Sequence, residues 1–436
     1  MNKPLNSENV GKNIWSNLNF WLNNAGLIKT EPVFNHKFTN EISNPDDIGD
    51  YLPGILWCGL NKNEVVQWTW DYIHLWDSKY KTEIGLFGSV GNDGKLINRN
   101  SFLNNADALY GFISLYMLDK KDIYLKCAED IVNALKNHGL SKKGFVFSSV
   151  GKNGSKFNFE RGTISHIPVV SDYYAECCCK LYELTNNSDY LNLAKKMLDA
   201  WSNTKWFKQY GVCIDRVYPG GFIARSKNAT ITKGNTYFGL AALAYGRNTG
   251  DYSLLKTILS NIEKNYKRHD GNYGKIFNIK SKNLIDPKSE ITYTKAVIDL
   301  YLDSSVALKD NSYYERALQI SNFFNLSDNC LLAEASDKNF FFIDSQSDMF
   351  TLYCKFFSID KNKLWKDKVY AILSGMNLFF DGKIYLNYIQ DGKQLPEAAA
   401  KYQGLILKAV ITAEKIFLEN EKFYENPILD WVSVDR

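Results

Sequence analysis

The feature that most constrains this chain is a helical hairpin between His166 and Asn203. Its first half is apolar on nearly every side, which is typical of a helix that is buried all round. After a break at residues 186–188, the second half keeps its apolar residues on one stripe and its polar residues on the other. The sequence therefore predicts an inner helix followed by an outer helix, with Ser188 as the N-cap of the second.

This hairpin recurs along the chain. Aligned on the outer helix, Tyr124, Tyr190, Tyr252 and Tyr313 stand at equivalent places, 66, 62 and 61 residues apart, and a weaker copy follows at Leu364. A period near 60 residues leaves room for two helices and a long connection in each unit. A regular repeat favours one large domain over residues 1–436, with residues 1–45 forming an N-terminal helix and an irregular segment that pack on the rest.

The predicted helices alternate between the two kinds. We expect inner helices at about 102–118, 166–184, 233–247, 290–307, 346–357 and 397–418, and outer helices at about 122–137, 189–202, 252–267, 312–325 and 361–378. Further helices are predicted at 7–25, from residue 50 and at 63–80. If the short helix from residue 50 is inner and the last inner helix pairs with the N-terminal one, seven hairpins close a ring; six is the alternative.

The connections differ in length and chemistry. Those from an inner to an outer helix are short, whereas those back to the next inner helix are long, rich in Gly and β-formers, and carry NDG, KNG or QDG. Each long connection is predicted to form a small β-hairpin. All of them then lie at one end of the ring, beside the N-termini of the inner helices, where free N–H groups and positive dipole ends converge. We expect the functional site there.

Composition excludes several classes of function. The net charge is +4 with acids and bases evenly spread, so no nucleic-acid partner is expected. No run of 18 apolar residues predicts a membrane span. Eight Cys without a secretion signal indicate reduced thiols and a cytoplasmic protein. Without nucleotide or zinc motifs we expect no cofactor, although oxygen-rich helix starts leave Ca²⁺ open. The 14% aromatic content suits a carbohydrate ligand, or a helical core.

The repeat plan, the loop polarity and the phrases GDYLPGILWCG and HIPVVSDYYAECCCKLYELT together resemble a known architecture. It is similar to the (α/α)6 or (α/α)7 toroid of six- and seven-hairpin glycosidase-like enzymes, a group that includes glycoside hydrolases, polysaccharide lyases and sugar 2-epimerases. The resemblance covers about residues 47–418. It implies an all-α fold and a carbohydrate-active enzyme, but no family motif transfers a role to any residue.

Polar and aromatic residues cluster where the inner helices are predicted to start. Glycoside hydrolysis needs two carboxyl groups, one to protonate the leaving oxygen and one to activate water or attack carbon. The candidate catalytic residues are Asp107, Asp172, Asp50 and Glu290. Asp46 and Asp47 lie beside Asp50, at the start of the same predicted helix. Three have ordinary structural alternatives: a helix cap for Asp50, a first-turn acid after the cap Ser289 for Glu290, and a buried polar contact for Asp172.

The candidate substrate-binding residues are those that can stack on or hydrogen-bond to a sugar: His166, Arg161, Trp57, Tyr173, Tyr237, Tyr293, Asn105, Asp348 and Glu397. Core packing, caps and loop salt bridges are the alternatives for these positions. We interpret the chain as a glycosidase-like hydrolase. A sugar epimerase or lyase with a His or Tyr base, or a non-catalytic glycan-binding or scaffold protein, remains open.

Overall fold

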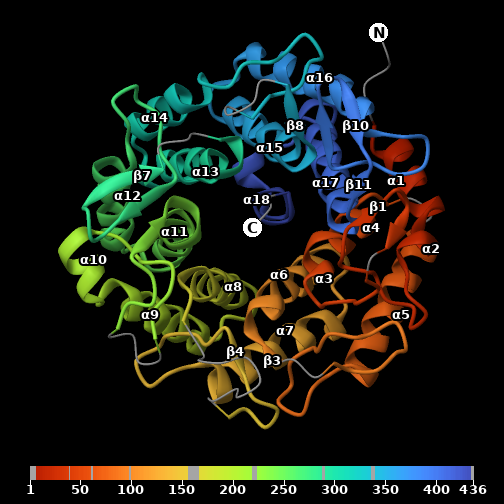
Figure 1. The fold of residues 1–436 in the computed structure, drawn as a ribbon, viewed down its shortest axis with the longest axis horizontal. Coiled ribbons are helices and arrows are strands. Elements are labelled where there is room, and N and C mark those ends of the chain that lie inside the picture. Colours follow the sequence, from red (N-terminus) through yellow and green to blue (C-terminus); the bar gives the residue numbers. More distant parts are fainter. Residues whose placement is uncertain are drawn as a thin grey trace.

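The structure, a computed structural model, describes residues 6–38, 40–59, 62–97, 100–155, 166–218, 223–286, 290–334 and 339–433. Within these residues, the helices form two concentric rings around a central axis (Figure 1). Each inner helix packs on the next, and the last inner helix packs on the first. The predicted (α/α) toroid is therefore confirmed, and its inner ring has seven members.

The inner ring is built from long helices that are buried on most sides. Its members are α3 (Asp47–Asp50) with α4 (Leu52–Trp57), α6 (Phe102–Asp119), α8 (Pro168–Thr185), α11 (Tyr237–Thr249), which continues a π-helical turn η2 (Thr232–Thr236), α13 (Ile291–Leu308), α15 (Ile343–Asp360) and α17 (Ala400–Phe417). The first member is short and enters between its neighbours through close glycine contacts. A Cβ on Gly49 would lie 2.4 Å from the carbonyl oxygen of Asp107, and one on Gly404 would lie 2.3 Å from that of Asp50.

The outer ring covers the inner one with amphipathic helices. Its members are α5 (Lys62–Lys79), α7 (Asp122–Ala134) with η1 (Leu135–Gly139), α9 (Ser188–Ser202) with α10 (Lys205–Tyr210), α12 (Ser253–Tyr266), α14 (Asn311–Ser321) and α16 (Lys363–Met376) with η3 (Asn377–Phe379). The seventh place belongs to the N-terminal helices α1 (Ser7–Ser16) and α2 (Leu18–Trp21), since α1 packs on α17. The N-terminal helix thus completes the last hairpin.

Two details of the outer helices differ from the sequence prediction. The N-cap of α9 is Asn187, whose side chain accepts a hydrogen bond from the backbone of Asp189, and Ser188 is already helical. In α14 the fully packed ring belongs to Tyr314, whereas Tyr313 is half-buried. The packed tyrosine of α14 thus stands one residue later, counted from the N-cap, than Tyr190 of α9.

Small antiparallel sheets occupy the long connections. The strands are β1 (Val33–Phe34), β2 (Lys37–Phe38), β3 (Asn100–Ser101), β4 (Ser149–Val150), β5 (Asn228–Thr230), β6 (Ile276–Asn278), β7 (Asn283–Asp286), β8 (Phe340–Phe342), β9 (Tyr388–Gln390), β10 (Lys393–Leu395) and β11 (Glu397–Ala398). They pair as β11-β1-β2, β10-β9-β8, β3-β4 and β5-β6-β7. Each sheet joins connections of neighbouring units, and the β11–β1 pair links the two ends of the chain.

An amide side chain anchors several of these connections to the ring. Asn105, the fourth residue of α6, accepts a hydrogen bond from the backbone N–H of Phe87 and donates one to its carbonyl, both at 2.9 Å. Gln346 of α15 does the same for Leu332, at 2.8 and 2.7 Å. Asn235 and Gln403 hold Cys213 and Tyr385 in the same way. We call this repeated contact the amide clamp; it fixes the turn after an outer helix to the next inner helix.

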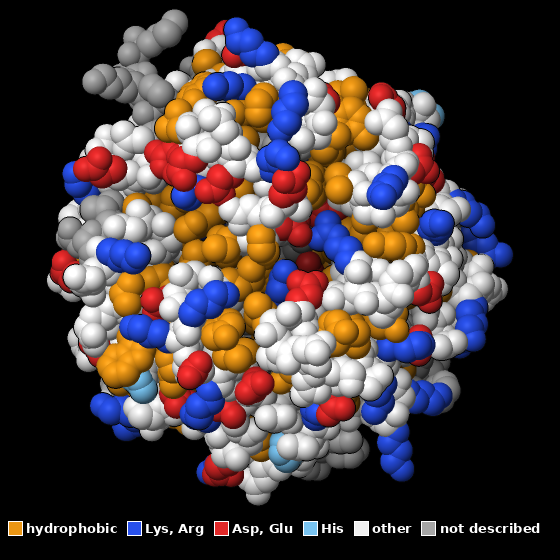
Figure 2. Space-filling view, turned by 180° about the vertical axis from the view of Figure 1, so that it is seen from behind, with side chains coloured by type: hydrophobic (Ala, Val, Ile, Leu, Met, Phe, Trp, Pro, Cys, Tyr) orange, Lys and Arg blue, Asp and Glu red, His pale blue; other side chains and the backbone are white. Residues whose placement is uncertain are grey.

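After α17 comes a short segment with η4 (Phe423–Glu425) and α18 (Pro427–Val432), which lies at the centre of the ring (Figure 1). Figure 2 shows the molecule from behind that view, with basic and acidic side chains around a small hollow near the centre. Among the described residues, no helix is both long and apolar enough to cross a membrane. None of the eight cysteines, all of which lie in the described ranges, forms a disulfide bond.

Candidate active site

The inner helices present one face to the axis, and contacts with the C-terminal segment identify it. Tyr110 of α6 hydrogen-bonds to the carbonyl of Trp431, and the Lys180 ammonium of α8 lies 5.2 Å from the centre of the Trp431 ring. Lys355 of α15 lies 5.1 Å from the ring of Phe423. Residues three, four or seven places earlier on the same helices share that face. The axial face can therefore be followed up each helix toward the long connections.

Two layers result. The lower layer consists of the ninth and thirteenth residues of the inner helices: Tyr110, Glu176, Lys180, Asp299, Asp303, Lys355 and Lys408. The upper layer consists of the second and sixth residues: Leu103, Asp107, Val169, Tyr173, Thr292, Asp344, Asp348 and Lys401. Three sequence-predicted site residues, Asp107, Tyr173 and Asp348, are each the sixth residue of their helix. The fold thus places them at one height around the axis, beside the N-terminal ends of the inner helices.

A group of carboxylates stands at the start of the first inner helix. Asp46 precedes α3, Asp47 opens it and Asp50 ends it. The carboxylate of Asp47 accepts a hydrogen bond of 2.5 Å from the Thr30 hydroxyl. Burial raises the pKa of Asp46 to about 6, and burial together with the neighbouring Asp46 raises that of Asp47. One oxygen of Asp46, Oδ1, is buried, and no described residue donates a hydrogen bond to it. Asp46 therefore keeps its proton up to about pH 6, well above the range of an ordinary aspartate.

Lysines and aspartates also lie at the starts of other inner helices, at the end of the ring that we call the mouth. Lys401, the second residue of α17, lowers the pKa of Asp46 and Asp47 by its charge, although burial outweighs it. Farther along, Lys295 of α13 forms ion pairs with Asp344, at 3.0 Å, and with Asp348. Asp348 is thus held by an ion pair on the axial face of α15. Sequence reasoning missed both lysines, although a lysine on a buried helix is itself a signal that a carboxylate faces it.

Aromatic rings occupy the other half of the mouth. Tyr173 of α8 and Tyr237 of α11 lie with their ring centres 5.5 Å apart, and both are half-buried. Tyr293 in the first turn of α13 accepts a hydrogen bond from Lys275, whose ammonium also lies 4.0 Å above the ring. The three tyrosines named from the sequence therefore lie on consecutive inner helices. Two of them form a pair, and the third carries a basic neighbour.

Asp172 lies beside this site rather than on the axial face. It neighbours Ser171, which accepts a hydrogen bond of 3.0 Å from the indole N–H of Trp201 on the outer ring. Asp172 is 2% exposed, and neither of its oxygens has a hydrogen-bond partner among the described residues. Burial, and then the charge of Glu176, raise its pKa well above the usual range. Asp172 is thus a buried acid whose surroundings favour its protonated form, one residue before Tyr173.

His166 and Asn105 are used by the scaffold. Asn105 forms the amide clamp on Phe87 and is fully buried. In α8 the fourth residue is a serine instead of an amide. The clamp hydrogen bond to the carbonyl of the connection comes from His166 instead, from Nδ1 to the carbonyl of Val146 at 2.8 Å. Its ring packs against those of Phe145 and Phe147, and burial lowers its pKa to about 4. Neither residue enters the proposed site below.

The remaining predicted residues lie apart from the axial layers. Trp57 is the last residue of α4, at the opposite end of the inner helix from the mouth. Glu290 precedes α13, where its charge raises the pKa of the buried Glu334. Glu397 stands in strand β11, not in a first helical turn, and accepts a hydrogen bond from Asn387 at 3.0 Å. Arg161 lies outside the described residues.

Glu334 is a buried, hydrogen-bonded carboxylate near the starts of α13 and α15 that we did not predict from the sequence. It is 5% exposed and comes from the connection before α15. Its carboxylate accepts hydrogen bonds from the backbone of Ile291 at 3.0 Å and from the hydroxyl of Ser345 at 2.5 Å. These contacts cap α13 and join it to α15, so Glu334 supports the mouth. No group of three or more His, Cys, Asp or Glu side chains in the described ranges is arranged to hold a metal ion.

Comparisons with known proteins support the architecture. No family model matches the chain, and no curated protein matches it in sequence. Among solved structures, a D-mannose isomerase shares 12% identity over 78% of this chain and 95% of its own, with a TM-score of 0.60. The cellobiose 2-epimerase of Bacillus thermoamylovorans shares 12% identity over 93% of this chain and 98% of its own, with a TM-score of 0.57.

A third similar structure is a GH76 α-mannanase of Bacteroides thetaiotaomicron. It shares 13% identity over 96% of this chain and 98% of its own, with a TM-score of 0.53. At these identities the likeness establishes the fold and not the reaction. The chain therefore has the (α/α) toroid architecture that these enzymes share, as the resemblance in the sequence predicted.

Proposed function

We propose that this protein is a carbohydrate-active hydrolase that binds a glycan at the upper layer of the toroid. The observation that carries the proposal is Asp46, a carboxyl with a pKa of about 6 and a buried, unpartnered oxygen at the mouth of the ring. A group with that pKa is protonated below about pH 6 and in a smaller fraction at pH 7, and the protonated form can give its proton to a leaving oxygen. Three solved enzymes of this fold, a D-mannose isomerase, a cellobiose 2-epimerase and an α-mannanase, act on sugars or glycans.

The other parts of a glycosidase have candidates nearby. Hydrolysis needs a second carboxyl group that stays ionised, and the spacing of the two decides whether configuration is retained or inverted. Asp50 follows one helical turn after Asp46, and Asp107 belongs to α6 where that helix packs against Gly49. Either can serve as the base or nucleophile. Asp348, fixed by Lys295, can accept hydrogen bonds from sugar hydroxyls. The ring pair of Tyr173 and Tyr237 can stack on an apolar sugar face.

The second candidate is a sugar epimerase or isomerase, favoured by the higher TM-scores of the D-mannose isomerase and the cellobiose 2-epimerase. Such a reaction needs a base that removes a proton from carbon, and we named a His or a Tyr for that role. The one histidine beside an inner helix, His166, is buried between two phenylalanines, and its Nδ1 is hydrogen-bonded to the carbonyl of Val146. Tyr173 and Tyr237 keep this alternative open, whereas the carboxylates favour hydrolysis.

The test compares both reactions on the same protein. Purified enzyme is incubated with chromogenic glycosides and neutral oligosaccharides, and separately with reducing sugars in D₂O. Hydrolysis releases a new reducing end, whereas epimerisation incorporates deuterium beside the carbonyl. We expect release of reducing ends, and Asp46→Asn lowering kcat by about 10²–10⁴-fold, the usual contribution of a general acid. Asp71→Asn on the outer helix α5 is the matched control. Deuterium incorporation without hydrolysis, or a fully active Asp46→Asn variant, contradicts the proposal.

A further inference from the structure

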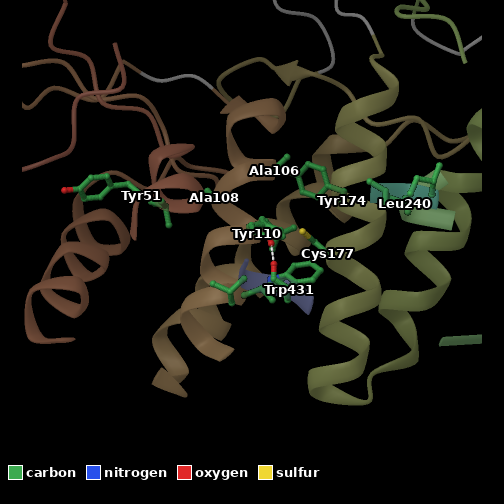
Figure 3. Close-up of a cluster of buried hydrophobic side chains, with 14 of the residues drawn as sticks. Tyr51, Ala106, Ala108, Tyr110, Tyr174, Cys177, Leu240 and Trp431 are labelled. Carbon is green, nitrogen blue, oxygen red and sulfur yellow. Dashed lines mark hydrogen bonds between the residues drawn. The ribbon is translucent and has the colours of Figure 1, made fainter. Parts of the chain in front are cut away.

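The C-terminal segment, here residues 419–433, lies inside the ring instead of on its surface. It follows α17, the last inner helix, and places α18 at the ring centre (Figure 1). In Figure 3, Trp431 lies between α6 and α8 at the height of Tyr110 and Cys177, while Ala106 lies nearer the long connections. A segment at this place faces the same space as the proposed site.

Aromatic contacts fix the segment to α6 and α8. The Tyr110 hydroxyl donates to the carbonyl of Trp431, and the two rings are stacked with centres 4.6 Å apart and planes at 25° (Figure 3). The ammonium of Lys180 lies 5.2 Å from the centre of the Trp431 ring. Trp431 is 6% exposed. It is thus packed from two inner helices and positioned as a rigid residue.

Charged contacts fix the segment to three more inner helices. Arg247 of α11 forms an ion pair with Asp430 at 2.9 Å. The Tyr424 hydroxyl donates to Asp303 of α13 at 3.1 Å. Lys355 of α15 is fully buried, pairs with Asp303 at 2.8 Å and lies 5.1 Å from the ring of Phe423. The segment therefore contacts five of the seven inner helices, all through axial side chains.

These contacts lie at or below the lower layer, so the upper layer stays uncovered by this segment. Tyr110 is the ninth residue of α6, and eight steps of 1.5 Å place it about 12 Å below the start of the helix. The whole helix has 18 residues and is about 27 Å long at the same rise. By this measure the segment lies about 12 Å below the starts of the inner helices and occupies the centre of the ring at that depth.

A polar group of this segment has no partner in the described part of the protein. The indole N–H of Trp431 is buried, and no described residue accepts its hydrogen bond. Buried donors in folded proteins almost always have an acceptor. The acceptor for this N–H is therefore expected from outside the described residues, and a water or a hydroxyl group of a ligand can supply it.

We propose that the C-terminal segment is the floor of the substrate pocket and that it selects the ends of glycan chains. A closed pocket admits a chain end, whereas cleavage inside a chain needs room on both sides of the bond. In this arrangement the Trp431 N–H contacts the terminal sugar residue, and Trp431 determines specificity without taking part in the chemistry. The inference rests on the proposed carbohydrate function of the same site.

The experiment follows the products of the purified full-length protein on neutral oligosaccharides of increasing length, labelled at one end. We expect products shortened stepwise from one chain end. A mixture of internal fragments overturns the floor proposal while leaving the hydrolase proposal intact. Absence of hydrolysis on every glycan tested, in contrast, refutes the proposed function itself, so the two failures are distinguishable.

A substitution at the floor tests the contact directly. Trp431→Phe keeps a ring against Tyr110 and removes the N–H. We expect KM to rise about 2- to 12-fold, as for one neutral hydrogen bond, with kcat and Tm unchanged. The control is Trp70→Phe on the outer helix α5, which leaves KM unchanged. An unchanged KM for Trp431→Phe, or an equal rise in the control, overturns the contact.

Discussion

Replacing Asn105 by alanine tests whether the amide clamp holds a connection in place. The amide makes three hydrogen bonds, to the N–H and the carbonyl of Phe87 and to the carbonyl of Ser101, all at 2.9 Å. At about 1 kcal/mol net for each neutral hydrogen bond, the loss is about 3 kcal/mol, and the buried Phe87 groups are left without partners. We therefore expect the turn at residues 81–87 to open more often while the ring stays folded.

Hydrogen exchange followed by mass spectrometry measures that opening. A loss of about 3 kcal/mol corresponds to a rise on the order of 100-fold in the exchange rate of the peptide that contains Phe87, since each 1.4 kcal/mol is tenfold. The peptide containing Leu332, clamped by Gln346, serves as an internal control, and Asn104→Ala as the matched variant. Unchanged exchange at Phe87 in Asn105→Ala, with sugar binding lost, would refute the clamp and restore Asn105 as a ligand contact.

Two further predictions concern charge. Lys355→Met removes the ammonium that pairs with the buried carboxylates of Asp299 and Asp303, so we expect a loss of about 3–5 kcal/mol in the free energy of unfolding measured in urea. The exposed Lys363→Met should cause no measurable change, and equal midpoints for the two variants would contradict this. The raised pKa of Asp46 means that the folded protein binds this proton more tightly, so its contribution to stability is present at low pH and is lost between about pH 4 and 6. Asp46→Asn should therefore gain stability relative to the unsubstituted protein as pH rises through that window, measured as the difference in Tm; a constant difference would refute the pKa shift.

The fold was predictable from the sequence because its signals are local. A helix buried all round followed by an amphipathic helix needs only its own residues to be recognised, as in α8 and α9. The uncertainty between six and seven hairpins arose at the ends. The N-terminal helix completes a hairpin with α17, whose sequence lies almost the whole chain away, and no local pattern announces a contact of that kind. The pairing of β1 with β11 closes the ring for the same reason.

The candidate site was predictable in position and only partly in detail. The start of each inner helix could be located, so Asp107, Tyr173 and Asp348 were found at what the structure shows to be equivalent places. His166 could not be judged, because its burial depends on Phe145 and Phe147 and its role on the serine that replaces a clamp amide in α8. The spacing of residues along one helix does not show which hydrogen bonds the neighbouring connection needs.

The C-terminal segment was not predictable at all, and the reason bears on function. Residues 419–433 are polar and aromatic without helical periodicity, so they give no signal of burial. Their partners are Tyr110, Asp303 and Lys355, charged or hydroxyl-bearing residues on inner helices whose other sides are buried in the ring. A buried lysine or aspartate on such a helix needs a polar partner. The lower layer is polar where it contacts the segment and its ion pairs, whereas the carboxylates and tyrosines of the proposed site belong to the upper layer. That difference in what the two layers face is the physical basis for placing a ligand in the upper one.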